Sequence, residues 1–257
     1  MLRLYCAREG QMKAIDPDLL LRAYSIGVFP MADSRAADDV YWVEPKKRGI
    51  LPLDRFRLSR SLAKTIRSDR FAVSVDQAFA DVVAQCAAST EDRPDTWINP
   101  AIERAYADLH RRGHAHSIET WQGGRLVGGL YGVKLGGAFF GESMFSRESN
   151  ASKVALAWLV ARLRAGCFRL LDCQFITEHL RSMGAIEVSR DDYVALLDSA
   201  LGFAGAGSAT VSDAAWPRAD FFALDVVAPP GATDPERRTV SGPISGCTIV
   251  QLLGQTS

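Results

Sequence analysis

The pattern of hydrophobic and polar residues predicts helices alternating with short strands. Asp16-Pro17 is a typical helix N-cap followed by proline at the first helical position, and the helical spacing after it ends at Gly27. Asn99-Pro100 is a second clear helix start. Helical spacing also covers residues 59–68, 77–88, 96–113, 150–166, 177–185 and 189–201. Runs of apolar residues predict strands at residues 40–45, 48–53, 70–76, 116–122, 124–146 and 168–175.

The order of these elements predicts the fold class. Strands mixed with helices, with one long helix between two strands, indicate an α/β (α+β) protein. From residue 76 onward the order fits the GNAT acyltransferase architecture, in which the central helix begins at a gap in the sheet where substrates meet. We therefore predict a GNAT-like catalytic domain over residues 76–257, preceded by a small basic α/β domain over residues 1–75. Residues from about 203 show little periodicity and are expected to form an arm.

Composition places the chain among ordinary globular proteins, since 47% of its residues are hydrophobic and 23% are charged. No apolar run approaches the roughly 20 residues that span a bilayer, and the start, MLRLYCAREG, becomes charged too soon for a signal peptide. The cysteines form no CxxC pair and the histidines no HExxH pair. We expect a cytoplasmic protein with reduced thiols, no membrane partner, no metal and no cofactor.

Charge is balanced over the whole chain but unevenly distributed. Residues 1–75 carry 14 Lys and Arg against 9 Asp and Glu, and most of the excess lies in residues 45–70. A basic patch on a neutral protein indicates attraction to a polyanion, although the same charges would suit the solvated face of a helix over residues 59–68. The basic residues of this stretch are Lys46, Lys47, Arg48, Arg55, Arg57, Arg60, Lys64, Arg67 and Arg70.

Two polar residues interrupt the segment RLLDCQF, which otherwise has the composition of a buried strand. In an extended chain Asp172 and Gln174 project from one face, while Cys173 projects from the other. A buried carboxylate is costly unless it is paired. These two groups therefore form either a hydrogen-bonded core pair or part of a site.

Glu142 is another carboxylate in apolar surroundings, within the segment GESMFS. Three interpretations suit this position: a salt bridge to an internal arginine, a cap on the following loop, or recognition of a cationic ligand. The side chains of Lys and Arg differ in length, and a carboxylate can bind either cation. It would therefore suit a site that tolerates both.

The segment that opens the predicted helix at residue 150 argues against acetyl-CoA as a substrate. GNAT enzymes that use CoA hold its pyrophosphate on a Q/R-x-x-G-x-G/A loop at the helix N-terminus. Here the segment is SRESNASKVA, which has no glycine and in which Glu148 adds negative charge. A different acyl donor is therefore expected.

Several spaced blocks resemble those of leucyl/phenylalanyl-tRNA–protein transferases, over roughly residues 15–200. The blocks are LLLRAYSIGVFPM, YWVEPKKRGILPL, HSIETW, GAFFGESMFSRESNASKVAL and LLDCQFITEHLRSMGA, and the final QLLGQTS also fits. The chain departs from the family at Tyr41 and Met31, where tryptophan is common. The resemblance implies transfer of Leu, Phe or less often Met from aminoacyl-tRNA to proteins with N-terminal Arg or Lys, which marks them for N-end-rule degradation.

The resemblance also implies catalytic roles. Gln174 would orient the attacking amine or hold the substrate carbonyl, and Asp172 would polarise Gln174 and stabilise or accept the developing positive charge. For Glu142, the third candidate, the carboxylate itself suggests recognition of the cationic N-terminal residue of the acceptor, or of its amine. His116 and Glu119, in HSIETW, receive no firm role.

Substrate contacts are expected from apolar, aromatic and basic residues. The pocket for the Leu or Phe side chain would be formed by Phe139, Met144, Leu156 and Leu171, each of which taken alone also suits a plain core position. The 3′-terminal adenosine would stack between Trp42 and Trp97 with Tyr106 nearby, although Trp97 would also suit a helix anchor. The basic stretch would follow acceptor-stem phosphates without reading sequence.

Other functions remain open from the residues alone. A CoA-dependent GNAT N-acetyltransferase is disfavoured by the missing pyrophosphate loop, and a non-catalytic RNA-binding module would not need DCQ and GESMF at their spacing. Aminoacyl-tRNA transferases that build peptidoglycan are usually longer, with duplicated domains. A monomer is expected.

Overall fold

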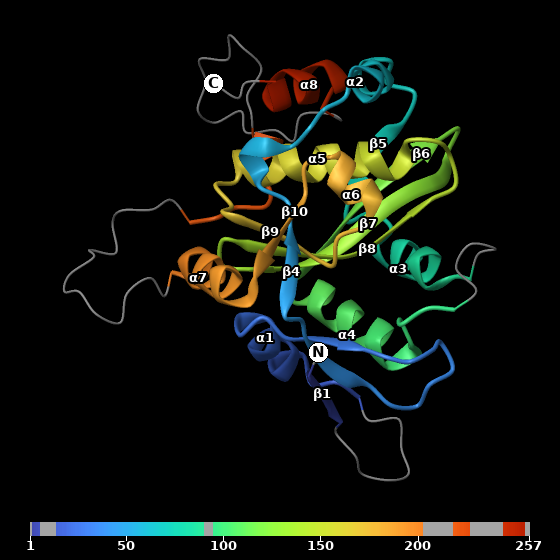
Figure 1. Cartoon of the computed structure of the whole chain (residues 1–257). Helices are drawn as coiled ribbons and strands as arrows, with labels where there is room; N and C mark the ends of the chain where they lie inside the picture. Colours follow the sequence, from blue (N-terminus) through green and yellow to red (C-terminus); the bar gives the residue numbers. More distant parts are fainter. Residues whose placement is uncertain (1, 6–13, 90–94, 203–217, 227–243, 255–257) are drawn as a thin grey trace.

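The computed structural model describes residues 2–5, 14–89, 95–202, 218–226 and 244–254 (Figure 1). These residues form helices packed against two β-sheets, which confirms the predicted mixed α/β class. Within these ranges, no helix combines the length and the apolar character that crossing a membrane requires.

The larger sheet has seven strands, which in spatial order are β10 (Ile186–Ser189), β4 (Lys47–Ile50), β9 (Leu170–Gln174), β8 (Ala138–Ser146), β7 (Arg125–Leu135), β6 (Ala115–Gln122) and β5 (Ala72–Val75). Neighbouring strands are antiparallel except β8 and β9, which are parallel. The tight turn between β6 and β7 is formed by Gly123 and Gly124, both with positive φ, as a two-residue hairpin requires. A smaller sheet has the order β1 (Leu2–Tyr5), β3 (Tyr41–Glu44), β2 (Phe29–Met31).

Helices cover both faces of the larger sheet. On one face α5 (Ala151–Ala165) crosses β6, β7 and β8, and is itself covered by α2 (Arg60–Arg67) and α8 (Gly246–Gly254) (Figure 1). The other face carries α1 (Pro17–Ser25), α3 (Phe79–Ala87), α4 (Pro100–Arg111) and α7 (Arg190–Leu201). The short helix α6 (Glu178–Ser182) follows β9.

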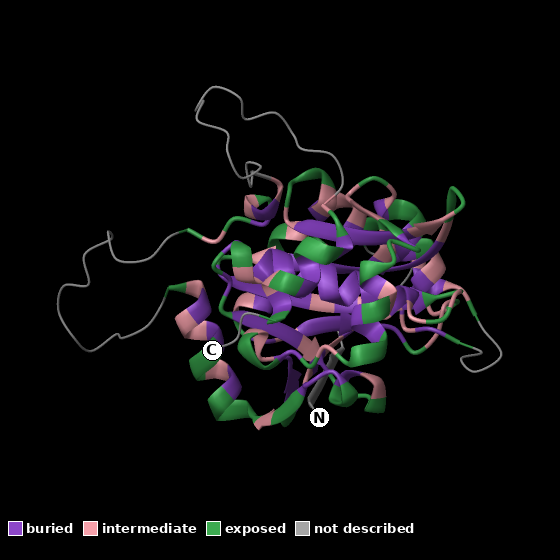
Figure 2. Ribbon diagram, turned by 90° about the horizontal axis from the view of Figure 1, so that it is seen from above, coloured by how far each residue is buried: buried purple, intermediate pink, exposed green. Residues whose placement is uncertain are grey.

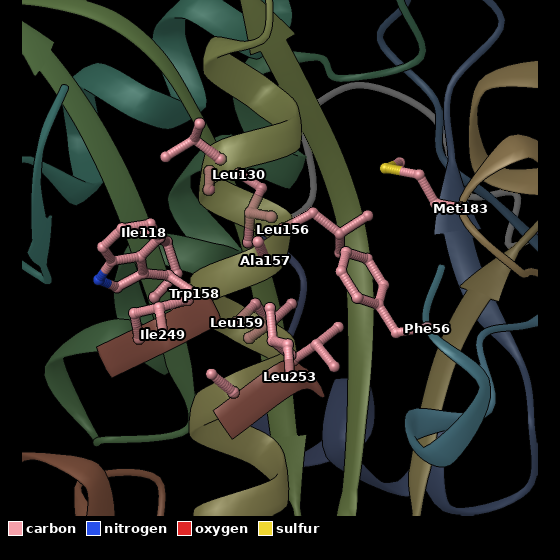
Figure 3. Packing of buried hydrophobic residues seen from close by; sticks show 14 of the residues in the cluster. Phe56, Ile118, Leu130, Leu156, Ala157, Trp158, Leu159, Met183, Ile249 and Leu253 are labelled. Atoms are coloured by element: carbon pink, nitrogen blue, oxygen red, sulfur yellow. The ribbon is translucent and has the colours of Figure 1, made fainter. Parts of the chain in front are cut away.

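Helix α5 lies at the centre of the core, as the buried layer in Figure 2 indicates. Twelve of its 15 residues are buried, because a helix between a sheet and other helices has no face in contact with water. This explains why residues 154–161, more than two turns of the helix, are apolar on every side. Figure 3 shows Trp158 of this helix near Ile249 of α8, and Leu159 near Leu253.

The division between the two sheets does not coincide with the predicted domain boundary at residue 75. Strand β4 precedes that residue and β5 ends at it, yet both strands belong to the larger sheet. Strand β4 lies inside this sheet because it pairs with β9 on one side and with β10 on the other. The smaller N-terminal unit therefore consists of residues that precede β4.

Part of the predicted C-terminal arm packs in the core. Phe221 is fully buried, and its ring stacks on those of His116 and Phe139, with centroids 4.2 and 5.5 Å away. Arg162 of α5 donates two hydrogen bonds of 2.7 Å to the carboxylate of Asp225. The prediction of a loose arm is thus wrong for residues 218–226, and the rest of the stretch 203–240 lies outside the described residues.

Candidate active site

A cavity of about 490 Å³ lies where strands β8 and β9 separate. The two strands pair from Ala138 and Leu170 to Phe140 and Asp172, and β8 then continues to Ser146. The start of α5 and the segment that leads to α6 close the other sides. The wall is largely apolar, and its apolar residues include Trp97, Leu130, Met144, Leu156, Leu159, Leu171, Cys173 and Phe175.

Glu142 of β8 lies in this wall and is buried. Its Oε1 accepts a hydrogen bond from the Tyr24 hydroxyl at 2.6 Å, and its Oε2 accepts one from the Tyr106 hydroxyl at 2.8 Å. The two phenol oxygens are themselves 2.7 Å apart. Burial raises the pKa of Glu142 to about 7, although hydrogen bonds to the carboxylate act in the opposite direction.

Gln174 ends β9 and lines the same cavity. Its φ of +59° lies in the left-handed region, which costs roughly 1–2 kcal/mol for a residue with a side chain. Its backbone N–H donates to Asp172 Oδ1 at 2.7 Å, which stabilises this conformation. The side chain lies close enough to Glu142 to lower the pKa of that carboxyl, but Nε2 is buried and makes no hydrogen bond of normal geometry within the described residues. This amide is therefore a hydrogen-bond donor in the cavity wall that has no partner within the described residues.

Asp172 is fully buried and its carboxylate is saturated with donors. Arg48 Nε and Nη2 donate bonds of 2.6 to 3.0 Å to both oxygens, and the Tyr193 hydroxyl donates at 2.8 Å. The link from Asp172 to Gln174 runs through the backbone N–H, so the expected polarisation of the carboxamide by this carboxylate is not observed. Asp172 thus lies behind Gln174, and its carboxylate is not open to the cavity.

The structure contradicts the prediction that Arg48 contacts RNA phosphates. Its side chain turns inward from β4 toward Asp172, and the residue is 1% exposed. The rings of Phe29 and Tyr193 flank the guanidinium, with centroids 4.6 and 4.7 Å away, and Nη1 donates to the Gly27 carbonyl at 3.0 Å. This arginine therefore joins the loop after α1, strands β2 and β9, and helix α7 through its own contacts.

The predicted substrate-binding residues divide into two groups. Those that line the cavity are Trp97, Met144, Leu156 and Leu171. Phe139 does not, because its ring is fully buried against Phe221, so the predicted pocket contact is wrong. Tyr106 is also fully buried and bonded to Glu142, which leaves no ring face for a nucleobase. Trp42 is half-buried on β3, away from the lining of this cavity, and its stacking role stays a prediction.

Several residues of the site were not predicted from the sequence. Leu130 and Leu159 complete the apolar wall, and His179 lines the cavity, where burial and then the charge of Lys153 lower its pKa. The spacing of Leu159 three positions after Leu156 placed it on the same helix face, a signal that could have indicated its role. Tyr24 is 118 residues from Glu142 in sequence, and no local pattern joins the two.

His116 and Glu119 lie outside the cavity and tie strands together. His116 Nδ1 bonds to Asp76 Oδ2 at 2.7 Å, and Glu119 accepts hydrogen bonds from the hydroxyls of Ser74 and Ser117. Both therefore have structural partners on neighbouring segments. Across the described part of the chain, no three His, Cys, Asp or Glu side chains are grouped to hold a metal ion.

The other basic residues of the stretch 45–70 lie at the surface. The exposed ones are Lys46, Lys47, Arg55, Arg57, Arg60, Lys64, Arg67 and Arg70. On α2 the apolar side packs inward, which leaves Arg60, Lys64 and Arg67 on the outer side. Lys47 pairs with Glu187 at 2.8 Å. Eight of the nine basic residues of this stretch are therefore exposed, and Arg48 is the exception.

The sequence is similar to those of known proteins over most of its length. Residues 50–198 match the family model described as Leucyl/phenylalanyl-tRNA protein transferase, and residues 13–46 match the N-terminal domain of that family. A leucyl/phenylalanyl-tRNA–protein transferase of Rhizorhabdus wittichii is 84% identical over 252 residues, which cover 96% of this chain and 100% of that protein. The chain therefore belongs to the leucyl/phenylalanyl-tRNA–protein transferase family, as its sequence blocks indicated.

Two further relatives carry the same name. The protein of Zymomonas mobilis is 71% identical over 187 residues, covering 73% of this chain and 70% of its own length. The protein of Afipia carboxidovorans is 52% identical over 228 residues, covering 89% of this chain and 94% of its own length. The N-terminal match ends at residue 46, one residue before β4 begins, close to the division between the two sheets.

Proposed function

We propose that this protein transfers leucine or phenylalanine, and less often methionine, from aminoacyl-tRNA to proteins with N-terminal Arg or Lys, which marks them for N-end-rule degradation. The observation that carries the proposal is the unpartnered Gln174 amide beside Glu142 in a cavity with an apolar wall. An apolar wall suits a Leu or Phe side chain, an amide donor suits a carbonyl oxygen, and a carboxylate suits a cation. The names of the relatives describe the same donor and the same kind of acceptor.

The reaction needs positioning more than activation. A free α-amine has a pKa of about 7.7–8.0, so part of it is neutral at neutral pH, and an ester is a reactive acyl donor. The amine nitrogen attacks the ester carbon, the bond to the ribose oxygen breaks, and that oxygen leaves with a proton. Gln174 Nε2 would hold the carbonyl oxygen while negative charge develops on it. Orientation of the reactants alone can supply effective molarities of about 10⁵ M or more.

The proposal includes a GNAT-like arrangement of the larger sheet. Its support is the parallel pair β8 and β9, which separates after Phe140 and Asp172, with α5 beginning beside the separation. The aminoacyl ester would enter there, with the terminal adenosine stacked on Trp97. Stacking of this kind is worth about 1–3 kcal/mol per base and tolerates any base.

Mixing the purified protein with Leu-tRNA or Phe-tRNA and a peptide that begins with Arg tests this function. Transfer of the amino acid to the peptide is expected, and the same peptide with an N-terminal Asp should remain unmodified. Acetyl-CoA in place of the tRNA should give no product. Acetylation of the peptide combined with no transfer from tRNA would instead support the N-acetyltransferase function.

The exposed basic residues should make tRNA binding depend on salt. Each lost phosphate contact is expected to reduce the slope of log affinity against log salt by about 1. The double variant Lys64→Ala/Arg67→Ala should therefore weaken aminoacyl-tRNA binding most at low salt, with a flatter salt dependence in filter-binding or anisotropy titrations. Arg112→Ala, an exposed change at the end of α4, is the matched control. An unchanged slope in the double variant would show that α2 does not contact the RNA.

A further inference from the structure

Four oxygen atoms, the two of the Glu142 carboxyl group and the hydroxyls of Tyr24 and Tyr106, are joined by three contacts at hydrogen-bond distance. Tyr24 Oη lies 2.6 Å from Glu142 Oε1, Tyr106 Oη lies 2.8 Å from Oε2, and the two phenol oxygens are 2.7 Å apart. Each of these three contacts needs a hydrogen atom between its oxygens. The two phenols supply two, and an ionised carboxylate supplies none. With an ionised Glu142, one pair of oxygens would face each other with no hydrogen between them.

We propose that the acceptor-free enzyme keeps a proton on Glu142, shared in a ring with Tyr24 and Tyr106, and that a cationic acceptor expels this proton on binding. The identity of the acceptor rests on the proposed function. In the ring, the carboxyl O–H donates to one tyrosine, that tyrosine donates to the other, and the second donates back to the free carboxyl oxygen. When the acceptor binds, the carboxyl O–H bond breaks, the proton passes to the solvent, and the carboxylate becomes the counter-ion of the acceptor.

The surroundings of the ring favour a neutral carboxyl in the empty site. Burial is the largest influence and raises the pKa of Glu142 to about 7. The titratable, charged and amide groups around it are Tyr24 on α1, Tyr106 on α4, Tyr131 on β7, Asp172 and Gln174 on β9, and Arg48 on β4. Asp172 disfavours ionisation of Glu142 and Arg48 favours it. Because these two are bound to each other as a bidentate pair, their charges largely cancel at Glu142.

The ring has a consequence for acceptor recognition. An entering ammonium or guanidinium group lowers the pKa of a nearby carboxyl, so the ionised form is favoured only when the acceptor is present. Below the pKa of the empty site, each bound acceptor must displace about one proton, and affinity should fall about tenfold for each unit that the pH decreases. The site thus avoids an unpaired buried carboxylate while it is empty.

Infrared difference spectroscopy of the full chain tests the ring without any substrate. The carbonyl band of a protonated carboxyl should be present at about pH 6 and disappear with a midpoint near 7, against about 4.3 for an ordinary glutamate. The band should be absent from Glu142→Gln, whose amide can fill the same ring without titrating. A spectrum at about pH 6 that is identical in wild type and Glu142→Gln would overturn the proposal.

Protein stability gives a second comparison of wild type with Glu142→Gln. The folded-state pKa of Glu142 is raised above its unfolded value, so the contribution of this residue to stability is fully present below about 4.5 and is lost as pH rises through about 7. The midpoint of urea unfolding should therefore fall over this range in wild type relative to Glu142→Gln. If the difference in unfolding midpoint between wild type and Glu142→Gln stayed the same at every pH, it would contradict a proton retained on Glu142.

Calorimetry with a short peptide that begins with Arg tests the coupling to the acceptor. Titrations in two buffers of different ionisation enthalpy count the protons released, and at about pH 6 wild type should release about one proton for each peptide bound. Binding at this pH without proton release would overturn the coupling. A peptide that fails to bind while the infrared band is present would leave the ring supported and would count against the proposed acceptor instead.

Discussion

Replacement of Asp172 with alanine is expected to lower the free energy of unfolding by about 3–5 kcal/mol, because it leaves Arg48 as an unpaired buried cation. The Tyr193 hydroxyl and the Gln174 backbone N–H lose their acceptor at the same time. Transfer activity should fall too, since Gln174 loses the bond that stabilises its left-handed backbone. Urea unfolding followed by circular dichroism measures the first effect, and aminoacyl transfer measures the second.

Two other variants separate the buried charge from a general loss of contacts. Glu187→Ala breaks the exposed pair with Lys47, one position along β4 from Arg48, and should change stability much less. The double variant Arg48→Met/Asp172→Leu removes both charges and should recover part of the stability lost in Asp172→Ala, without recovering activity. Equal unfolding midpoints for wild type and Asp172→Ala would show that Arg48 is not held as described.

Replacement of Gln174 with alanine is expected to reduce kcat for aminoacyl transfer about 10²–10³-fold, the usual effect of removing one donor to a developing oxyanion. Stability should change little, because Nε2 has no hydrogen-bond partner to leave unpaired within the described residues. Gln174→Glu keeps the shape of the side chain but replaces the donor with a carboxylate oxygen, and kcat should fall at least as far. Steady-state kinetics with Leu-tRNA and a peptide that begins with Arg gives kcat for both variants.

Cys173→Ala is the matched control for Gln174. Cys173 precedes Gln174 on β9 and lines the same cavity, but its thiol is partly buried in the core and offers only a weak donor. The kcat of the Cys173→Ala variant should stay within a few-fold of the wild-type value. A Gln174→Ala enzyme as active as Cys173→Ala would remove the carboxamide from the mechanism.

The parts of the fold set by short-range interactions could be predicted from the sequence. Asp16 caps α1 by accepting from the backbone N–H of Asp18, and Asn99 caps α4 in the same way through Ile102. Gly27 is another such case, since its φ of +79° suits glycine after a helix end. A cap acts within a few residues, so one sequence contains the information that places it. Figure 1 therefore shows most of the helices where the spacing predicted them.

The parts set by distant partners could not be predicted. Arg48 follows Lys46 and Lys47 in the chain and has the composition of a surface residue, but its partner Asp172 is 124 residues away. Glycine at position 27 is also required by a residue distant in sequence, because a Cβ there would lie 2.8 Å from the ring of Tyr193. A charge run predicts exposure on average, and only the fold selects the member that pairs inside.

Helix α8 shows a related limit. Its buried residues include Ile249 and Leu253, which pack on α2 and α5, elements far earlier in the chain (Figure 3). The segment is short and is flanked by glycine at both ends, so local spacing gave little indication of a helix. Tertiary packing rather than propensity stabilises it.

A crystal structure with a non-reactive amide analogue of leucyl-adenosine tests the central claim most directly. The leucyl side chain is expected to contact Met144, Leu156 and Leu171, and the amide carbonyl oxygen is expected within hydrogen-bond distance of Gln174 Nε2. An analogue bound elsewhere, or bound in this cavity with its carbonyl turned away from Gln174, would contradict this claim.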